Sequence, residues 1–209
     1  MRGRVEDYLA ALSDLMRRAE ATDGSGRALP FDDGIERFMR YARRSHAAGN
    51  KIMFIGNGGS AAIASHLAID YCKNGALRAL AFNDASALTC LANDFGYAQV
   101  FAKQIEFHAR RDDLLVAISS SGRSANILRG VEAARLLGCG VVTFSGFTES
   151  NELRRSGDVN FYLRSSAYGF VEIGHLALCH AMLDLHLGWG GASVDHVVAD
   201  RAVAQVDAQ

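Results

Sequence analysis

The chain of 209 residues has the length of one large domain, which excludes two complete hydrophobic cores. Hydrophobic residues make up 49% of it and charged residues 22%, which excludes a disordered or solvating tail. The 22 basic and 23 acidic residues leave a net charge of −1 (22 − 23), so no overall field attracts nucleic acid or an anionic membrane surface.

A single domain over residues 1–209 is therefore expected, with helices in 1–50, a core in 51–188 and a tail in 189–209. The first helix carries an apolar residue every three or four positions, at Val5, Leu9, Leu12 and Met16. The segment TDGSGRALPFDD at 22–33 breaks this pattern, and a second helix follows and ends at Gly49.

Five short apolar runs come next, each followed by a helical segment. They lie at residues 51–56, 77–82, 113–119, 140–145 and 159–163. Runs in which apolar and polar residues do not alternate are typical of strands buried on both faces. A chain in which strands and helices follow one another in turn implies parallel pairing of the strands. The pattern predicts an α/β fold with a doubly wound parallel sheet of about five strands flanked by helices. Ligands of such sheets bind beyond the carboxyl ends of the strands.

A glycine-rich turn, GNGGS at residues 56–60, follows the first strand. Its glycines allow a sharp turn and a close approach to a ligand, and Ser60 could cap the next helix, whose first amides favour an anion. A tight turn would explain the glycines without a ligand, and the loop matches neither the dinucleotide pattern GxGxxG nor the Walker pattern. Alone, the loop leaves both interpretations open.

A serine-rich loop, SSSGRS at residues 119–124, follows the third strand and opens a helix at about residue 124. Hydroxyls and free amides at the start of a helix are neutral donors that can surround a phosphate without a lysine. A loop with a single helix cap is the alternative. Four serines in six residues favour phosphate binding.

The two loops, in this order, resemble those of the sugar isomerase (SIS) domain family, whose members bind phosphosugars through a serine-rich loop. GNGGSAA, LANDFGY at 91–97 and AISSSGRSANI are similar to strings of the phosphoheptose isomerase subgroup at comparable spacing, within a resemblance over roughly residues 35–188. It implies a flavodoxin-like SIS domain with helices before the sheet. The substrate contacts that it implies are Asn57, Gly58, Ser60, Asn93, Asp94, Ser119, Ser120, Ser121, Ser124 and Glu172.

The same resemblance implies one zinc ion per subunit, at positions that are His66, Asp70, Glu172 and His180 in this chain. His66 and Asp70 are one helical turn apart, so one ion can reach both, although an ion pair without metal is the alternative. Glu172 and His180 are eight residues apart, a rise of about 12 Å along a helix, so to share one ion they must lean toward each other along the axis or come from two subunits. His175 is therefore an alternative ligand, or else a helix histidine that bonds a backbone carbonyl or lies at a subunit contact.

Two of these positions depart from the subgroup's pattern. Asp70 stands where the subgroup has a glutamate that acts as base, and Glu172 stands where it has a neutral glutamine. Two carboxylates would cancel the charge of a zinc ion, and a less positive ion polarises a substrate oxygen less strongly. These changes could mark another sugar, another metal or a slower enzyme.

The resemblance implies conversion of sedoheptulose 7-phosphate to D-glycero-D-manno-heptose 7-phosphate through a metal-assisted enediol. Asp70 and His180 would carry the protons, the loop serines would bind the phosphate, and Asn57, Ser60 and Asp94 would fix the chain hydroxyls. The alternative is a non-catalytic SIS protein that binds a partner protein, like a replication regulator of the family, or senses a phosphosugar. That alternative predicts no tightly bound metal.

Assembly, location and thiols complete the expectations. The resemblance implies a homotetramer with active sites at subunit contacts, and the uncovered apolar face of the N-terminal helices favours an interface. Apolar runs shorter than the ~20 residues of a bilayer span, and acids near the N-terminus, predict a cytoplasmic protein.

His46, His108, His186 and His196 have no motif around them and are expected at the surface or an interface. The cysteines lie in apolar stretches and are expected as buried free thiols at Cys72, Cys90, Cys139 and Cys179.

Overall fold

Five parallel strands form the centre of the sheet, and they correspond to the five predicted apolar runs. The computed structural model describes residues 2–191 and places seven strands in the order β2-β1-β7-β6-β5-β3-β4. The parallel strands are β3 (Ile52–Gly56), β4 (Ala79–Ala81), β5 (Leu114–Ser119), β6 (Gly140–Ser145) and β7 (Val159–Tyr162). The chain adds β4 on one side of β3 and β5 on the other, so the topological switch point lies between β3 and β5. The predicted fold class is confirmed.

The segment at 22–33 is more than a break between helices, and here the prediction was incomplete. It contributes to a hairpin of β1 (Glu20–Asp23) and β2 (Ala28–Leu29), and β1 pairs antiparallel with β7. The Asp23 carboxylate accepts hydrogen bonds from Ser25 and from the Arg27 amide, which close the turn. These bonds lower the pKa of Asp23 to about 2, and the bond from the Ser25 hydroxyl has the largest effect. The sheet thereby gains two antiparallel strands beyond β7.

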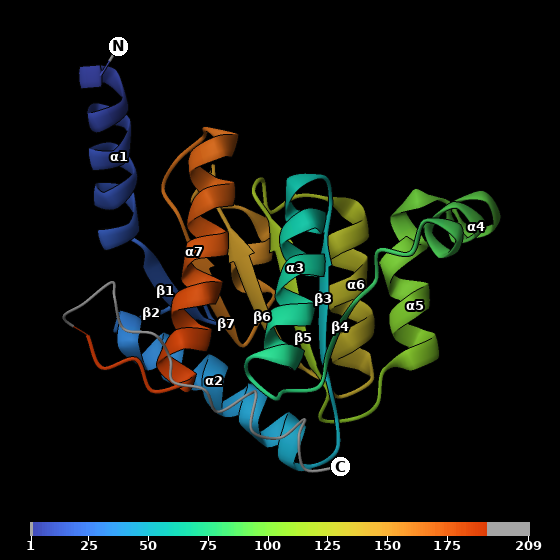
Figure 1. Ribbon diagram of the computed structural model, residues 1–209. Coiled ribbons are helices and arrows are strands. Elements are labelled where there is room, and N and C mark those ends of the chain that lie inside the picture. The colour runs from blue at the N-terminus through green and yellow to red at the C-terminus, as the bar shows by residue number, and fades with distance from the viewer. Residues whose placement is uncertain (1, 192–209) are drawn as a thin grey trace.

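Helices cover both faces of the sheet (Figure 1). They are α1 (Arg2–Arg17), α2 (Phe31–Ala47), α3 (Gly59–Lys73), α4 (Ala85–Phe95), α5 (Val100–His108), α6 (Ala125–Leu136) and α7 (Tyr168–His186), with short 3-10 turns η1 (Tyr97–Gln99) and η2 (Glu152–Arg155). Neighbouring strand residues point to opposite faces, so Phe54 packs in the core under α2, α3 and α7, and Met53 packs in the core under α4, α5 and α6. Strands buried on both faces explain the continuous apolar runs.

The first helix stands away from the rest of the chain (Figure 1). It touches α7 through Tyr8, whose ring stacks on Phe170 with centroids 4.4 Å apart. Within its apolar stripe, Met16 is partly buried, but Val5 and Leu9 are 59% and 57% exposed. The predicted uncovered apolar face is therefore present in the single chain.

The prediction that the cysteines are buried free thiols is confirmed for two of them and wrong for the other two. All four are free; Cys139 and Cys179 are buried, whereas Cys72 and Cys90 are exposed. Cys72 lies against Ala79 of β4, which is the last strand of the sheet, so one side of the thiol faces solvent. Cys90 lies on the outer side of α4 beside the exposed carboxylate of Asp94.

Three of the four histidines that have no motif around them lie in the part of the chain that the structure describes. His46 and His108 are exposed and His186 is half-buried, while His196 and most of the predicted tail lie outside the described residues. Within residues 2–191, every helix is too short or too polar to cross a bilayer.

Candidate active site

The two predicted loops meet at the switch point of the sheet. β3 and β5 are neighbours with Gly56 opposite Ile118, so the glycine loop and the serine loop leave the sheet side by side. A cavity of about 120 Å³, the serine cavity, opens between them. Its lining residues are Asn57, Ser60, Ile118, Ser119, Ser120, Ser121, Ser124, Tyr168 and Glu172. Most of the predicted substrate contacts are thus brought together.

The glycine loop needs its glycines for steric reasons. A Cβ at Gly56 would lie 2.5 Å from the Ser60 carbonyl, so the first turn of α3 can pack against the strand only without one. Gly58 has a φ of +53° and is the N-cap of α3. Ser60 therefore lies inside the first turn, and the expectation that it caps the helix is wrong. Its side chain lines the cavity instead.

The serine loop gathers hydroxyls around its own backbone. Ser119 Oγ lies 3.3 Å from Ser124 Oγ and accepts a hydrogen bond from the Gly122 amide at 3.2 Å. Ser124 is the residue before α6, as the sequence predicts, and its side chain makes no cap bond with the helix. The hydroxyls and first amides of α6 therefore remain available to an anion in the cavity.

Glu172 is the charged side chain among the residues that line this cavity. It lies against the start of α3, where a Cβ at Gly59 would meet its carboxyl carbon at 2.4 Å. Among the described residues, 2–191, the cavity lining contains no lysine or arginine. Affinity for phosphate from this lining would come from hydroxyls and backbone amides, and it would have to exceed the repulsion from this carboxylate.

A second cluster, consisting of His66, Asp70 and His180, lies further along α3 and α7. Asp70 Oδ2 is 3.3 Å from His66 Nε2 and 3.7 Å from His180 Nδ1, and the two imidazole centroids are 5.2 Å apart. One donor atom from each residue lies within 4.8 Å of the others. Two imidazoles and one carboxylate are a donor set that suits zinc, and three protein ligands leave a position open for substrate. The residues present therefore fit the implied ion.

Glu172 is not a member of this cluster in the single chain, because it lies too far from His180 along α7. Eight residues along α7 correspond to about 12 Å, and Glu172 lies in the serine cavity near the start of the helix. With Asp70 as the one carboxylate, the cluster would leave a divalent ion a charge of +1 (2 − 1). The full cancellation of the ion's charge, which two carboxylates would cause, is therefore not expected from His66, Asp70 and His180 alone.

Three other predicted substrate contacts lie outside the cavity lining. Gly58 is exposed at the start of α3, and Asn93 and Asp94 are exposed on α4. The Asn93 amide donates a hydrogen bond to the Asp94 carboxylate at 3.0 Å. The structure does not join these residues to the serine cavity in the single chain.

Three residues of the site were not singled out in the sequence. Tyr168 lines the cavity from the first turn of α7, four residues before Glu172. Asn126 and Tyr97 both hydrogen-bond the side chain of Asn57. Both lie within the strings that carry the family resemblance, AISSSGRSANI and LANDFGY, and that membership was the available signal.

His175 has the structural role given as one alternative in the sequence. It is fully buried, its Nε2 lies 3.1 Å from the Ser145 carbonyl oxygen, and its Nδ1 has no partner among the described residues. Burial lowers the pKa of His175 to about 4, so the ring is neutral at pH 7 and Nε2 donates to the carbonyl. It stands outside the cluster of His66, Asp70 and His180.

This buried imidazole predicts acid sensitivity. An unfolded histidine titrates near 6.5, so between pH 6.5 and 4 the unfolded chain binds more protons and stability falls as the pH falls. From pH 7 to pH 5 this group should lower the free energy of unfolding by about 2 kcal/mol. Urea melts of the wild type and His175→Gln would measure it, with His46→Gln as an exposed control. Equal pH dependence in wild type and His175→Gln would contradict the assignment.

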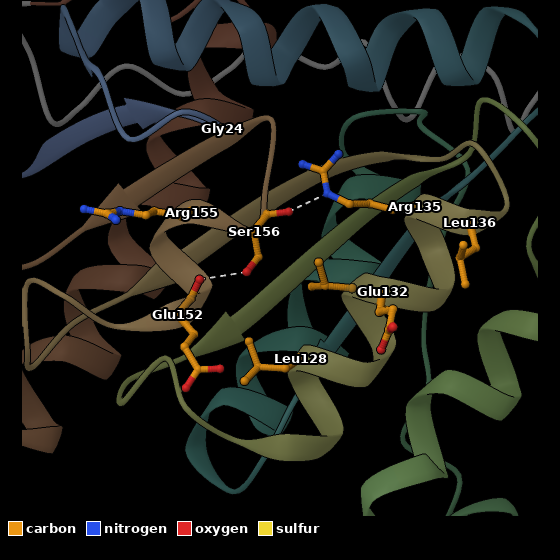
Figure 2. A pocket seen from close by; sticks show the side chains of 9 residues that line it. Gly24, Leu128, Glu132, Arg135, Leu136, Glu152, Arg155 and Ser156 are labelled. Carbon is orange, nitrogen blue, oxygen red and sulfur yellow. Dashed lines mark hydrogen bonds between the residues drawn. The ribbon is translucent and has the colours of Figure 1, made fainter.

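A larger groove of about 760 Å³ lies between α6 and η2 (Figure 2). It contains none of the predicted site residues. Arg135 is held there by the Ser156 carbonyl, to which its Nε donates at 2.6 Å, and Glu132 and Glu152 line the same groove. Acids and bases are mixed in this groove, and its lining has no cluster of hydroxyls like that of the serine cavity.

The comparisons with known proteins agree with the loops and the fold. The model of the SIS domain matches residues 7–146, and the chain belongs to this family, in its phosphoheptose isomerase branch. A phosphoheptose isomerase of Akkermansia muciniphila is 38% identical over an alignment of 157 residues, and the match covers 72% of this chain and 82% of the relative. One from Yersinia enterocolitica is 34% identical over 185 residues, covering 82% and 94%. The structure of phosphoheptose isomerase GmhA from Neisseria gonorrhoeae superposes with a TM-score of 0.75 at 29% identity, covering 88% of this chain and 98% of that one.

Proposed function

We propose that the protein isomerises sedoheptulose 7-phosphate to D-glycero-D-manno-heptose 7-phosphate. The observation that carries this proposal is the placement of two chemically different sites on the same two helices. α3 and α7 run side by side (Figure 1), and their first turns supply Ser60 and Tyr168 to the serine cavity. His66 lies six residues beyond Ser60, about 9 Å along α3. A sugar chain with a terminal phosphate can therefore have its phosphate in the cavity and its reacting end near the cluster.

The reaction moves one proton between carbons and another between oxygens. A ketose becomes an aldose when a proton leaves C1 and returns to C2, while the hydroxyl proton of O1 passes to O2. In the proposed mechanism Asp70 moves the carbon-bound proton and His180 moves the oxygen-bound proton, because a carboxylate and an imidazole can each accept and return a proton near neutral pH. Ser119, Ser121 and Ser124 would hold the phosphate.

His66, Asp70 and His180 are the residues that would hold a zinc ion, which when bound would stabilise negative charge on the substrate oxygens. Our prediction that Glu172 also binds the ion is tested by metal retention in Glu172→Gln. Glu172 lines the same cavity as Asn57 and Ser60, and these three residues are proposed to contact the sugar chain.

The alternative of a non-catalytic phosphosugar-binding protein requires the serine cavity but not the cluster. A binding module has no need of two imidazoles and a carboxylate within 4.8 Å of one another, which favours the enzyme. The test is conversion of sedoheptulose 7-phosphate and of unphosphorylated sedoheptulose by the same preparation. We expect turnover of the phosphate ester alone. Tight binding of the ester without product would instead support the binding protein.

Phosphate capture by the serine loop predicts a change in KM. In Ser121→Ala/Ser124→Ala two donors to the phosphate are lost, and each charge-assisted bond contributes about 1 to 3 kcal/mol. The loss of both bonds, at least about 2 kcal/mol, should therefore raise KM for the phosphosugar at least about thirtyfold, with a smaller effect on kcat. Steady-state kinetics measure this, and Ser150→Ala, an exposed serine outside the cavity, is the matched control. An unchanged KM in the double variant would place the phosphate elsewhere.

We further propose a homotetramer in which neighbouring subunits cover α1 and the metal cluster. Val5 and Leu9 form an exposed apolar stripe, and the His66 side chain is 51% exposed on the outer side of α3. Light scattering should give four times the mass of one chain, and Leu9→Glu should reduce it because a charge would be buried in the contact. A monomer at micromolar concentration would contradict the assembly.

A further inference from the structure

We infer that Asn126 and Tyr97 are positioning residues that hold the Asn57 side chain as a hydrogen-bond donor toward an acceptor oxygen of the bound phosphosugar. The inference rests on the proposed function, because it takes the cavity lined by Asn57 as the substrate site. It assigns a role to two residues that the proposed mechanism does not use.

The direction of each hydrogen bond follows from one backbone amide. The Ile127 N–H, which can only donate, is shared between the Ser124 carbonyl oxygen and Asn126 Oδ1, each at 3.0 Å, and an NH₂ group could not lie against this donor, which identifies the oxygen of the Asn126 side chain. Asn126 Nδ2 must then be the atom that donates to Asn57 Oδ1, at 2.8 Å. Asn57 Nδ2 donates in return to Asn126 Oδ1, at 2.9 Å. The two amides form a reciprocal pair with only one polarity.

Tyr97 completes the arrangement at Asn57. Its hydroxyl lies 3.0 Å from Asn57 Oδ1, and because that oxygen can only accept, the hydroxyl donates. Asn57 Oδ1 thus accepts two hydrogen bonds, which is its full capacity. One of the two Nδ2 hydrogens is used by Asn126, so a single N–H remains for a ligand. Asn57 can then donate to a phosphate or carbonyl oxygen but cannot accept from a hydroxyl.

The three residues come from different parts of the fold and differ in exposure. Asn57 follows β3, Asn126 is in the first turn of α6 after the serine loop, and Tyr97 begins η1. Asn126 is 3% exposed, whereas Tyr97 is 61% exposed. The partly buried amide pair therefore joins the glycine loop to the helix that follows the serine loop, and the tyrosine adds its bond from the surface. Without the Tyr97 donor, the Asn57 amide is held on one side only.

The test is a double-mutant cycle with Tyr97→Phe, which removes one surface hydroxyl and keeps the ring. We expect KM for sedoheptulose 7-phosphate to rise about three- to tenfold, the effect of one lost hydrogen bond, with kcat within about twofold. In an Asn57→Ala background the same change should have no further effect, because Tyr97 would act only through Asn57. Asn126→Asp, which replaces the donor to Asn57 by an oxygen, should raise KM at least as much, with its melting temperature recorded alongside. Tyr41→Phe, outside the cavity, is the matched control.

Each outcome decides between the proposals. Equal effects of Tyr97→Phe in the wild type and in Asn57→Ala, or no effect in the wild type, would overturn the positioning role while leaving the proposed function intact. A wild type that neither binds nor isomerises sedoheptulose 7-phosphate would overturn both proposals together.

Discussion

Asp70→Asn is expected to lower kcat at least about 100-fold, because the substitution keeps the size of the side chain and removes its basic oxygen. Asp70 is the one carboxylate of the cluster, and its Oδ2 lies within 4 Å of an imidazole nitrogen of both His66 and His180. Steady-state kinetics with sedoheptulose 7-phosphate, beside the metal content of the same preparation, measure the effect. Asp184→Asn, an exposed carboxylate on α7, is the control.

The metal content separates two roles of Asp70. An inactive variant that keeps its metal supports the role of base, whereas an inactive variant without metal shows a ligand only. Turnover near that of the wild type, with metal bound, would contradict the assignment and move the base to Glu172 or His180. Asp70→Glu need not be faster than the wild type, because the structure positions the shorter side chain against both imidazoles.

His66→Ala and His180→Ala are expected to lose the metal ion, since each removes one of three neighbouring donors and leaves an incomplete shell. Purified protein should contain about one zinc per chain in the wild type and close to none in these variants, by elemental analysis. His108→Ala, an exposed histidine outside the cluster, should keep the ion. Full metal content in both cluster variants would remove the cluster as a metal site.

The sheet and the two loops could be predicted because their signals are local. Strands buried on both faces require continuous apolar residues, and the turn after β3 requires glycine because a Cβ at Gly56 would meet Ser60. The hairpin of β1 and β2 could not be predicted in this way. Its strands have four and two residues, too few to show a period, and β1 is held in the sheet by pairing with β7, far along the chain.

The site residues could be predicted in part, and their grouping depended on tertiary packing. The sequence places His66 and Asp70 one turn apart, but only the packing of α3 beside α7 brings His180 to them and leaves Glu172 at the serine cavity. The bonds of Asn126 and Tyr97 to Asn57 likewise depend on where α6 and η1 pack. No local pattern reports such distances.

The most direct test of the central claim, proton transfer to form the aldose, is the reaction of sedoheptulose 7-phosphate in D₂O followed by NMR. The account predicts heptose 7-phosphate with deuterium at C2, because a base that takes the C1 proton can exchange it with solvent before returning it. In Asp70→Asn both the product and the deuterium should be nearly absent. A metal-loaded wild-type protein that binds the ester, yields no aldose and leaves the C1 protons unexchanged would contradict the claim.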